Sequence, residues 1–248
     1  MQNLCWSLAR VFCVIAAITG AASPVWAGGL SVSPVLVNMG AGQHSTAITL
    51  SNGGDQPQRI QAEVFRWTRV DGEDVLKADS QTLLNPPLFE MAPGGSQIVR
   101  LGFRRGALPP PDRESAYRVF FQEVPRTGAE PGAGTVTRLQ MVLRIGVPMF
   151  MAPAAPRPAL EWSASAKAGK LKLQLDNRGN IHVRVSKLRV SHPPAGAEQA
   201  VEGFFYVFPG ETQVWTLAAG TAGARGPLLL DALTDNGSVH VELPIKTD

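Results

Sequence analysis

Four histidines and twenty acidic residues are the side chains of this 248-residue chain that could support catalysis or bind a metal. His44, His182, His192 and His240 are scattered along the chain, and none has a neighbour at the spacing of a metal-ligand motif. His182 and His240 fall in alternating stretches, and we expect both to face solvent. No nucleophile motif occurs, and the acidic residues show no spacing that pairs two carboxylates. The sequence therefore predicts no catalytic site, no metal site and no cofactor.

The N-terminal segment predicts export. In residues 1–27, Arg10 precedes an apolar run, Val11–Ile18, and small residues then lead to Ala27. This pattern is typical of a signal peptide cleaved after Ala27, and the run is shorter than the roughly 20 residues of a membrane span. Both cysteines of the chain lie in this segment, so the mature chain has no thiol and no disulfide. We expect an exported protein that is not inserted in a membrane and whose fold depends on packing alone.

The charge of the chain is close to balanced. It has 23 Lys and Arg against 20 Asp and Glu, a formal net charge of +3. No basic run with interleaved aromatic residues occurs, so the sequence predicts no nucleic-acid partner.

Alternating apolar residues and turn residues run through the mature chain. We expect about seven strands between Leu30 and Phe150, with turns at Ser51–Gly54 and Pro93–Gly95. Pro34 interrupts the first alternating stretch, which favours an edge strand or one that changes sheets. No stretch of helical periodicity is present.

A proline-rich segment, residues 153–158, divides the mature chain. Pro153, Pro156 and Pro158 make it a stiff, extended connector. The strand pattern resumes after it. We therefore expect an all-β protein with one β-sandwich over residues 28–152, a linker over 153–158 and a smaller sandwich over 159–248.

One stretch just before this linker stands out because its apolar residues alternate without interruption. They are Leu139, Met141, Leu143, Ile145 and Val147, which share one face of a strand. Judged by periodicity alone, they are the core residues of the last strand of an ordinary sandwich.

Several motifs resemble the periplasmic chaperones of the chaperone–usher pilus pathway. Pro86–Leu101 is similar to that family's stretch in which Pro-Pro leads to Pro-Gly and then Val-Arg-Leu. Two further segments, Asp112–Ser115 and Phe121–Pro125, resemble its Arg-Glu-Ser and Arg-Glu-Ile-Pro region. In the second half, Asp176–Asn177, Phe208–Gly210 and Asp235–Gly237 fall in matching order.

The resemblance implies two immunoglobulin-like sandwiches set at an angle, with a cleft between them. It also implies a periplasmic chaperone that folds and caps pilus subunits and delivers them to an outer-membrane usher. On this reading Leu139, Met141, Leu143 and Ile145 form a donor strand that completes an unfinished subunit. Such an exposed edge is an aggregation hazard, which predicts either a self-capping oligomer in the free protein or a mobile loop, for which Gly128–Gly134 is the candidate.

The sequence departs from the family at the site that holds the subunit's terminal carboxylate. Two basic residues form that site in the family, and the matching positions here are Leu36 and Pro148. The candidate replacements are Arg144, Arg118 and Arg100, because arginine binds carboxylates with paired donors. The alternative is that these arginines form salt bridges with Glu114, Glu123 or Asp235.

The proline-containing end of the donor stretch, Val147–Pro153, and the Tyr117–Arg118 pair resemble the archaic branch of the family, which is associated with spore-coat protein U domains. Two other functions stay open. A fimbrial subunit or adhesin should carry its own donor extension and one incomplete domain. A secreted carbohydrate-binding sandwich needs an aromatic platform, and Trp67, Trp162 and Trp215 are far apart in sequence.

Overall fold

The structure is a computed structural model and describes residues 29–70, 72–125, 142–167, 169–191, 198–218 and 227–247. The predicted signal peptide lies outside these residues, and so do Gly128–Gly134, Leu139 and Met141. The described residues form strands, turns and loops without a helix. Among them there is accordingly no apolar helix of the length that a membrane crossing requires.

The first half of the chain forms a sandwich of two sheets. Its strands are β1 (Leu30–Ser33), β2 (Val37–Met39), β3 (Ser45–Asn52), β4 (Gln58–Val70), β5 (Glu73–Ala78), β6 (Thr82–Asn85), β7 (Leu88–Met91), β8 (Ser96–Phe103), β9 (Ser115–Glu123) and β10 (Arg144–Met151). One sheet has the order β1-β3-β8-β6, and the other has the order β2-β10-β9-β4-β5 with β7 also on β4. Alternate apolar residues of both sheets, such as Ile48, Leu50, Val99 and Phe121, are buried between them.

The second half repeats this architecture. Its strands are β11 (Leu160–Lys167), β12 (Lys170–Asn177), β13 (Val183–Ser191), β14 (Gln199–Val201), β15 (Phe205–Val207), β16 (Thr212–Ala218), β17 (Leu228–Thr234), β18 (Gly237–Leu243) and β19 (Ile245–Thr247). The sheet orders are β16-β12-β11-β19 and β14-β13-β17-β18, with β15 also on β13. Leu173, Leu175, Val185 and Leu230 are central to its core.

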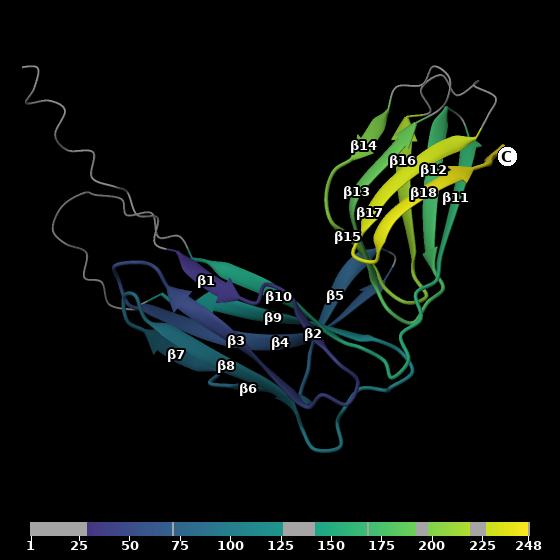
Figure 1. Ribbon diagram of the computed structural model, residues 1–248. Helices are drawn as coiled ribbons and strands as arrows, with labels where there is room; N and C mark the ends of the chain where they lie inside the picture. The colour runs from purple at the N-terminus through teal and green to yellow at the C-terminus, as the bar shows by residue number, and fades with distance from the viewer. Residues whose placement is uncertain are drawn as a thin grey trace, which may run out of the picture.

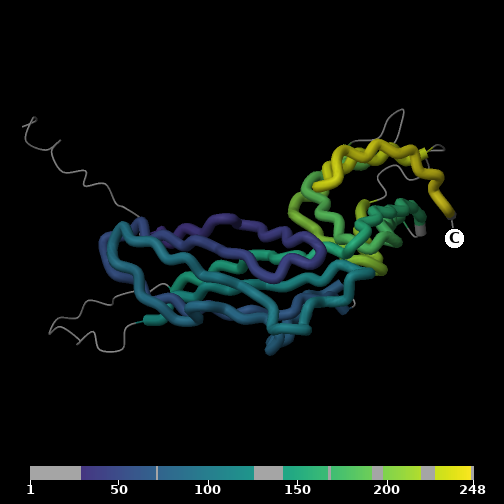
Figure 2. The backbone as a smooth tube through the Cα atoms, turned by 60° about the horizontal axis from the view of Figure 1, so that its bottom comes forward, coloured from purple at the N-terminus to yellow at the C-terminus, as the bar shows by residue number. Residues whose placement is uncertain are grey.

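The two sandwiches meet at one end and give the molecule the shape of an L (Figure 1). The backbone trace shows the same two lobes from another side, joined at the elbow (Figure 2). An angled pair of sandwiches therefore has an inner side on which both lobes can contact one partner.

The chain changes sheets at Pro34. β1 pairs antiparallel with β3 in one sheet, whereas β2 pairs parallel with β10 in the other. The Ser33–Pro34 peptide bond is cis. Because proline has no N–H, the ladder of β1 stops there. β1 is the edge strand of its sheet and the chain changes sheets after it, so both alternatives predicted from Pro34 occur.

The first sandwich has more strands than the sequence predicts. The additional ones include β2, β6 and β7, which have three or four residues each. Strands of that length are too short for alternation to be recognised. β5 was also missed, and it forms a hairpin with β4 around Gly72, whose φ of +83° favours glycine.

The same asparagine corner occurs in both sandwiches. The Asn52 side chain donates to the carbonyls of Gln56 at 2.8 Å, Ala92 at 3.1 Å and Met91 at 3.3 Å. In the second sandwich the Asn177 side chain donates to the carbonyls of Ile181 at 2.8 Å and Val207 at 2.9 Å. Each asparagine also accepts a hydrogen bond from the N–H two residues on, and both are 1 % exposed. The two lobes are thus built on one plan, although their sequences show no close repeat.

Candidate functional site: the interdomain cleft and the edge of β10

An aromatic cluster joins the two sandwiches at the elbow. Trp67 of β4 lies edge-on to Phe208 and Tyr206 of the second sandwich, with ring centroids 4.7 and 5.1 Å apart. Phe150 of β10 packs 6.1 Å from Trp67, and the cluster is buried. Such contacts exclude water from the junction, so the two lobes share a small core of their own.

His182 lies between the two lobes and is paired with a carboxylate from each. Its Nδ1 is 2.7 Å from Oε1 of Glu114, which precedes β9, and its Nε2 is 3.3 Å from Oδ2 of Asp235, in the β17–β18 turn. The Glu114 carboxylate also accepts the backbone N–H of His182 at 3.0 Å. The imidazole stacks on Phe150 with centroids 3.7 Å apart. The histidine therefore connects Glu114 of the first lobe to Asp235 of the second.

This environment makes His182 a cation at neutral pH. Burial alone lowers the pKa of His182, but the hydrogen bonds to Asp235 and Glu114 outweigh burial and raise its pKa from 6.5 to about 9. Burial raises the pKa of Asp235, yet its hydrogen bond to His182 brings that pKa below the ordinary value. The charged form of the pair is thus the stable one.

The prediction that His182 faces solvent is wrong, because its side chain is only 11 % exposed, whereas His240 has a side chain that is 73 % exposed. Alternation shows which side of a strand a residue takes. It gives no sign that the other lobe covers that side.

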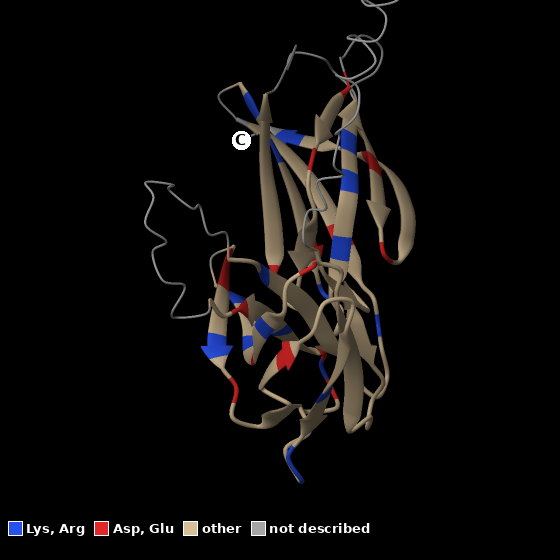
Figure 3. Cartoon of the chain, turned by 90° about the vertical axis from the view of Figure 1, so that its left-hand side faces the viewer, with Lys and Arg blue, Asp and Glu red and all other residues tan. Residues whose placement is uncertain are grey.

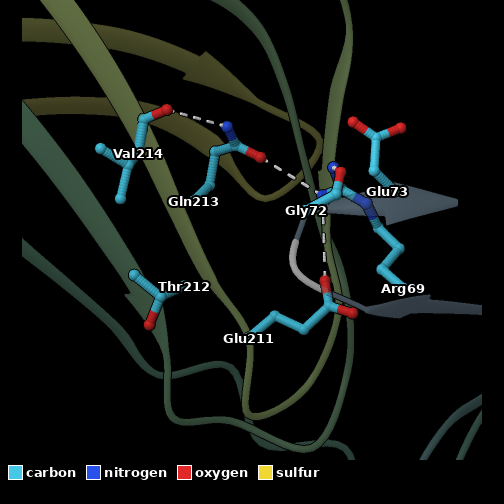
Figure 4. A pocket seen from close by; sticks show the side chains of 7 residues that line it. All are labelled: Arg69, Gly72, Glu73, Glu211, Thr212, Gln213 and Val214. Carbon is cyan, nitrogen blue, oxygen red and sulfur yellow. Dashed lines mark hydrogen bonds and ion pairs between the residues drawn. The ribbon is translucent and has the colours of Figure 1, made fainter.

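Arg69 forms a second connection, from the β4–β5 hairpin to β16 (Figure 4). Its guanidinium donates to the carbonyl of Tyr206 at 2.6 Å and to Oε1 of Gln213 at 3.3 Å, both in the second sandwich. Within the hairpin it pairs with Asp74 at 3.2 Å and donates to the carbonyl of Gly72. The fixed fork of the guanidinium can satisfy these acceptors together, so Arg69 ties the hairpin to the second lobe.

Arg118 lies on the cleft side of this junction. Its guanidinium is 4.0 Å from the centroid of the Trp67 ring. It lines an open cavity of about 490 Å³ between the β4–β5 hairpin and the segment Phe204–Tyr206. Phe204 is 73 % exposed at this cavity. The cavity is also lined by Glu73 and by the Arg69–Asp74 ion pair, so it combines charges of both signs with aromatic walls. Its Arg118 side can bind a carboxylate, and the aromatic rings can bind apolar groups.

The strand register relates Arg118 to Leu36 and Pro148, the two positions at which the family has basic residues. Pro148 of β10 is registered opposite Arg118 of β9. Leu36 directly precedes Val37, whose partner on β10 is Met149. Residues in one cross-strand row share a face. Arg118 therefore stands one strand inward from Pro148 and two strands inward from Leu36.

The two other candidate arginines lie elsewhere. Arg144 stacks 3.9 Å over the Phe120 ring near the start of β10. Arg100 is exposed on β8, in the other sheet. Of the alternative partners, Glu114 and Asp235 bind His182 instead. No ion pair joins any of the three arginines to Glu114, Glu123 or Asp235 within the described residues.

β10 has an edge that is only partly paired. Along its whole length it pairs with β9, but β2 covers only Met149–Met151 on the other side. The segment Arg144–Pro148 therefore has one side without a strand among the described residues. Leu143 precedes β10 and is 42 % exposed, while its carbonyl accepts the N–H of Glu123 at 2.9 Å. Ile145 is half-buried against the core of the first sandwich.

The sequence matches the family described as "Pili and flagellar-assembly chaperone, PapD N-terminal domain" over residues 29–157. The chain belongs to this chaperone family. A curated relative, the chaperone protein FimB/FhaD of Bordetella pertussis, is 31 % identical over 186 residues, which cover 71 % of this chain and 73 % of the relative.

Solved chaperone structures share the fold. One match is the CsuC–CsuE chaperone–tip adhesion subunit pre-assembly complex from the archaic Csu pili of Acinetobacter baumannii. The TM-score is 0.62, with 20 % identity, over 89 % of this chain and 99 % of that chain. The Escherichia coli chaperone DraB matches with a TM-score of 0.60 and 21 % identity, over 87 % and 99 %. The Salmonella enterica SafA pilin–SafB chaperone complex matches with a TM-score of 0.60 and 22 % identity, over 87 % of this chain and 97 % of that chain. The chaperone thus has two immunoglobulin-like β-sandwiches, as its sequence predicts.

Three structural features of the interdomain junction were not predicted from the sequence. They are the His182 ion pairs, the Arg69 connection and the aromatic cluster around Trp67. Glu114 and Asp235 do fall within motifs that resemble the family. Their shared partner could not be found without the fold, because it lies 68 residues from Glu114.

Proposed function

We propose that this chaperone completes unfinished pilus subunits with the edge of β10 and the segment before it. The observation that carries the proposal is the open side of Arg144–Pro148, which continues back to the exposed Leu143. Two of the similar structures are, by their names, complexes of a chaperone with a tip adhesion subunit and with a pilin. A free strand edge is what a partner that lacks a strand needs.

The physical basis is the cost of unpaired backbone groups. A sandwich without its last strand exposes a row of N–H and C=O groups and a groove of core side chains, and each unsatisfied buried group costs about 1 to 3 kcal/mol. A donated strand satisfies these groups. Side chains at alternate positions of that strand then fill the groove.

In the proposal Leu139, Met141 and Leu143 fill the subunit groove, and Ile145 lies at its border. Leu139 and Met141 are included on their sequence pattern, because they lie outside the described residues. Leu143 is accessible, whereas Ile145 packs on its own core in the free chaperone. Ile145 would therefore keep the register of β10 while the residues before it engage the subunit.

Arg118 is the anchor that we propose for the terminal carboxylate of the subunit. It lies in the interdomain cavity, in register with Pro148 and two strands inward from Leu36. Arg144 lies farther along the same face of β10 and would contact the subunit backbone or side chains near Phe120. Arg100 lies in the other sheet and fits this role least.

The proposal includes export and delivery. The family is one of periplasmic pilus chaperones, and we propose that cleavage after Ala27 releases this chaperone into the periplasm. There it would hold subunits without a cofactor and hand them to an outer-membrane usher. The free β10 edge also favours self-association in the absence of a subunit.

The decisive experiment is co-expression with small exported proteins from neighbouring genes, followed by co-purification. Leu143→Glu should lower subunit affinity about a hundredfold, because a leucine contact is lost and a charge is brought to an apolar groove. Leu83→Glu is a matched control, because Leu83 is 44 % exposed but lies on β6 of the other sheet.

Both variants should keep the thermal stability of the parent protein. Normal capture of subunit by a folded Leu143→Glu variant would contradict the proposed donor segment. Equal loss in both variants would show an unspecific effect of the added charge.

A further inference from the structure

Two lysines flank a serine in one cross-strand row of the second sandwich. Ser165 of β11 is registered with Lys172 of β12 on one side and with Lys246 of β19 on the other. Lys172 is exposed between the buried Leu171 and Leu173, so this row lies on the outer face of the sheet. Adjacent strands are about 4.8 Å apart, which puts the two lysine Cα atoms about 10 Å apart.

The row forms a trough and not a flat surface. The small residues of β11 leave a hollow of about 270 Å³, which is lined by Ser163, Ala164, Ser165, Lys172, Gln174 and Lys246. Its floor carries two hydroxyl groups, and its walls are the two lysine side chains. Basic positions lie beside the C-terminal end of the chain in Figure 3.

Neither lysine is neutralised by the chain that the structure describes. The ammonium groups of Lys172 and Lys246 have no hydrogen bond or ion pair among the described residues, and the ammonium group of Lys170 at the start of β12 likewise has none. The acids of this face, Glu161 and Asp176, are registered with each other about 13 Å farther along the strands. They are engaged there by Arg178 and by Thr212 and Gln174 respectively.

The arrangement of donors indicates the kind of anion. Lysine binds an anion as a point charge, without the paired fork that arginine offers to carboxylates and phosphates, so the shape of the trough and the directions of its donors decide which anion fits. A tetrahedral phosphate has oxygens in several directions. It can meet two ammonium groups from the sides and a serine hydroxyl from below.

We propose that the trough at Ser165 is a binding site for a phosphate group, with Lys172 and Lys246 as its cationic walls. The ligand is a phosphate ester or free phosphate. The site lies on the outer face of the second sandwich and is independent of the donor segment and of Arg118.

The test uses the mature, full-length chaperone. Inorganic phosphate and pyrophosphate are titrated at constant ionic strength, with acetate as the comparison anion, and amide NMR shifts of β11, β12 and β19 are followed. Saturable binding in the millimolar range or tighter is expected for phosphate and not for acetate. Shifts that do not saturate, or that acetate reproduces, would overturn the proposal.

Two double variants that remove the same charge at different places distinguish a specific phosphate site from a general effect of the protein's charge. Lys172→Ala/Lys246→Ala should weaken phosphate binding about thirtyfold, because two lysines are lost and each basic residue near an anionic phosphate surface contributes about 1 kcal/mol. Lys77→Ala/Lys187→Ala removes the same charge from β5 and β13 and should leave binding unchanged. Ser165→Val keeps the charge but fills the trough, and it should also weaken binding. Equal effects of the two double variants would exclude a specific site.

A second arm identifies the source of the phosphate. Phosphatidylglycerol vesicles should sediment with the parent protein but not with Lys172→Ala/Lys246→Ala if lipid headgroups are the ligand, with phosphatidylcholine vesicles as the control. Phosphate binding without vesicle binding would assign the site to a free phosphate compound. Binding of an acidic peptide in place of phosphate would overturn the proposal.

Discussion

Arg118 and Pro148 face each other across β9 and β10, and the guanidinium of Arg118 lies 4.0 Å over the Trp67 ring. A cation one strand inward from a proline can occupy nearly the same part of the cleft as a basic residue at the proline position. The proposed carboxylate anchor at Arg118 therefore does not require a basic residue at Leu36 or Pro148.

Replacing Arg118 should weaken subunit capture through the terminal carboxylate. Arg118→Ala should lower the affinity for a subunit, or for its C-terminal peptide, about ten- to a hundredfold, because a hydrogen bond to a charged group is worth about 1.5 to 3 kcal/mol. Isothermal titration with the free-acid and amidated peptides measures this loss. The amidated peptide should bind the parent protein and Arg118→Ala equally weakly. Arg100→Ala is the control, and an equal effect of this variant would remove the reason for assigning the anchor to Arg118.

His182 makes the junction sensitive to alkaline pH. Its folded-state pKa of about 9 lies above the unfolded value of 6.5, so its stabilising contribution is complete below pH 6.5 and is lost as the pH rises through about 9. The loss should be on the order of 2 to 3 kcal/mol. Urea unfolding of the parent protein and of His182→Gln between pH 6 and 10 measures it. The variant should be less stable at pH 6 and should show a flatter pH profile, and parallel profiles would contradict the ion-pair assignment.

The lowered pKa of Asp235 makes the stability of the folded protein depend on pH in the acidic range. Its contribution is present above the ordinary aspartate value of 3.8 and is lost as the pH falls through the lower folded-state value. The junction should therefore be strongest between about pH 4 and 6.5, and Asp235→Asn should remove the acidic limb of the profile measured by urea unfolding. An unchanged acidic limb would show that other carboxylates determine it.

Arg69 should control the angle between the lobes more than their stability. Arg69→Lys keeps the charge but loses the fork that reaches Tyr206, Gln213 and Asp74. We expect a broader distribution of interdomain angles in small-angle X-ray scattering, with a melting temperature within a few degrees of the parent. Lys77→Arg, on the same hairpin, is the control. A scattering profile identical to that of the parent would mean that the His182 pairs and the aromatic cluster suffice.

The asparagine corners should each support their own lobe. Asn52→Ala and Asn177→Ala leave buried carbonyl groups without a donor, which should cost about 2 to 3 kcal/mol of unfolding free energy each. The exposed Asn38 on β2 provides the control, Asn38→Ala. Denaturant unfolding followed by tryptophan fluorescence measures the loss, and stability equal to that of Asn38→Ala would show that water replaces the lost bonds.

Alternation and turn chemistry were enough to predict the all-β fold and the sheet change at Pro34. They worked because long strands such as β3, β8 and β12 bury every second residue. They failed for β2, β6 and β7, which are held by neighbouring strands and not by a pattern of their own.

The site was predicted less completely, for a related reason. Leu143 and Arg118 could be singled out because they lie in stretches that resemble the family. His182 could not, because its environment combines Glu114, Phe150 and Asp235, which are distant in sequence. Single-strand periodicity contains no information on which surfaces of two lobes will meet.

The recurrence of the asparagine corner in both lobes has an evolutionary consequence. Each half of the chain has a buried core of its own and an asparagine corner of its own. A module transplanted from a related chaperone would bring its own bracing along, so that natural recombination can change the geometry of the elbow while leaving both module interiors intact.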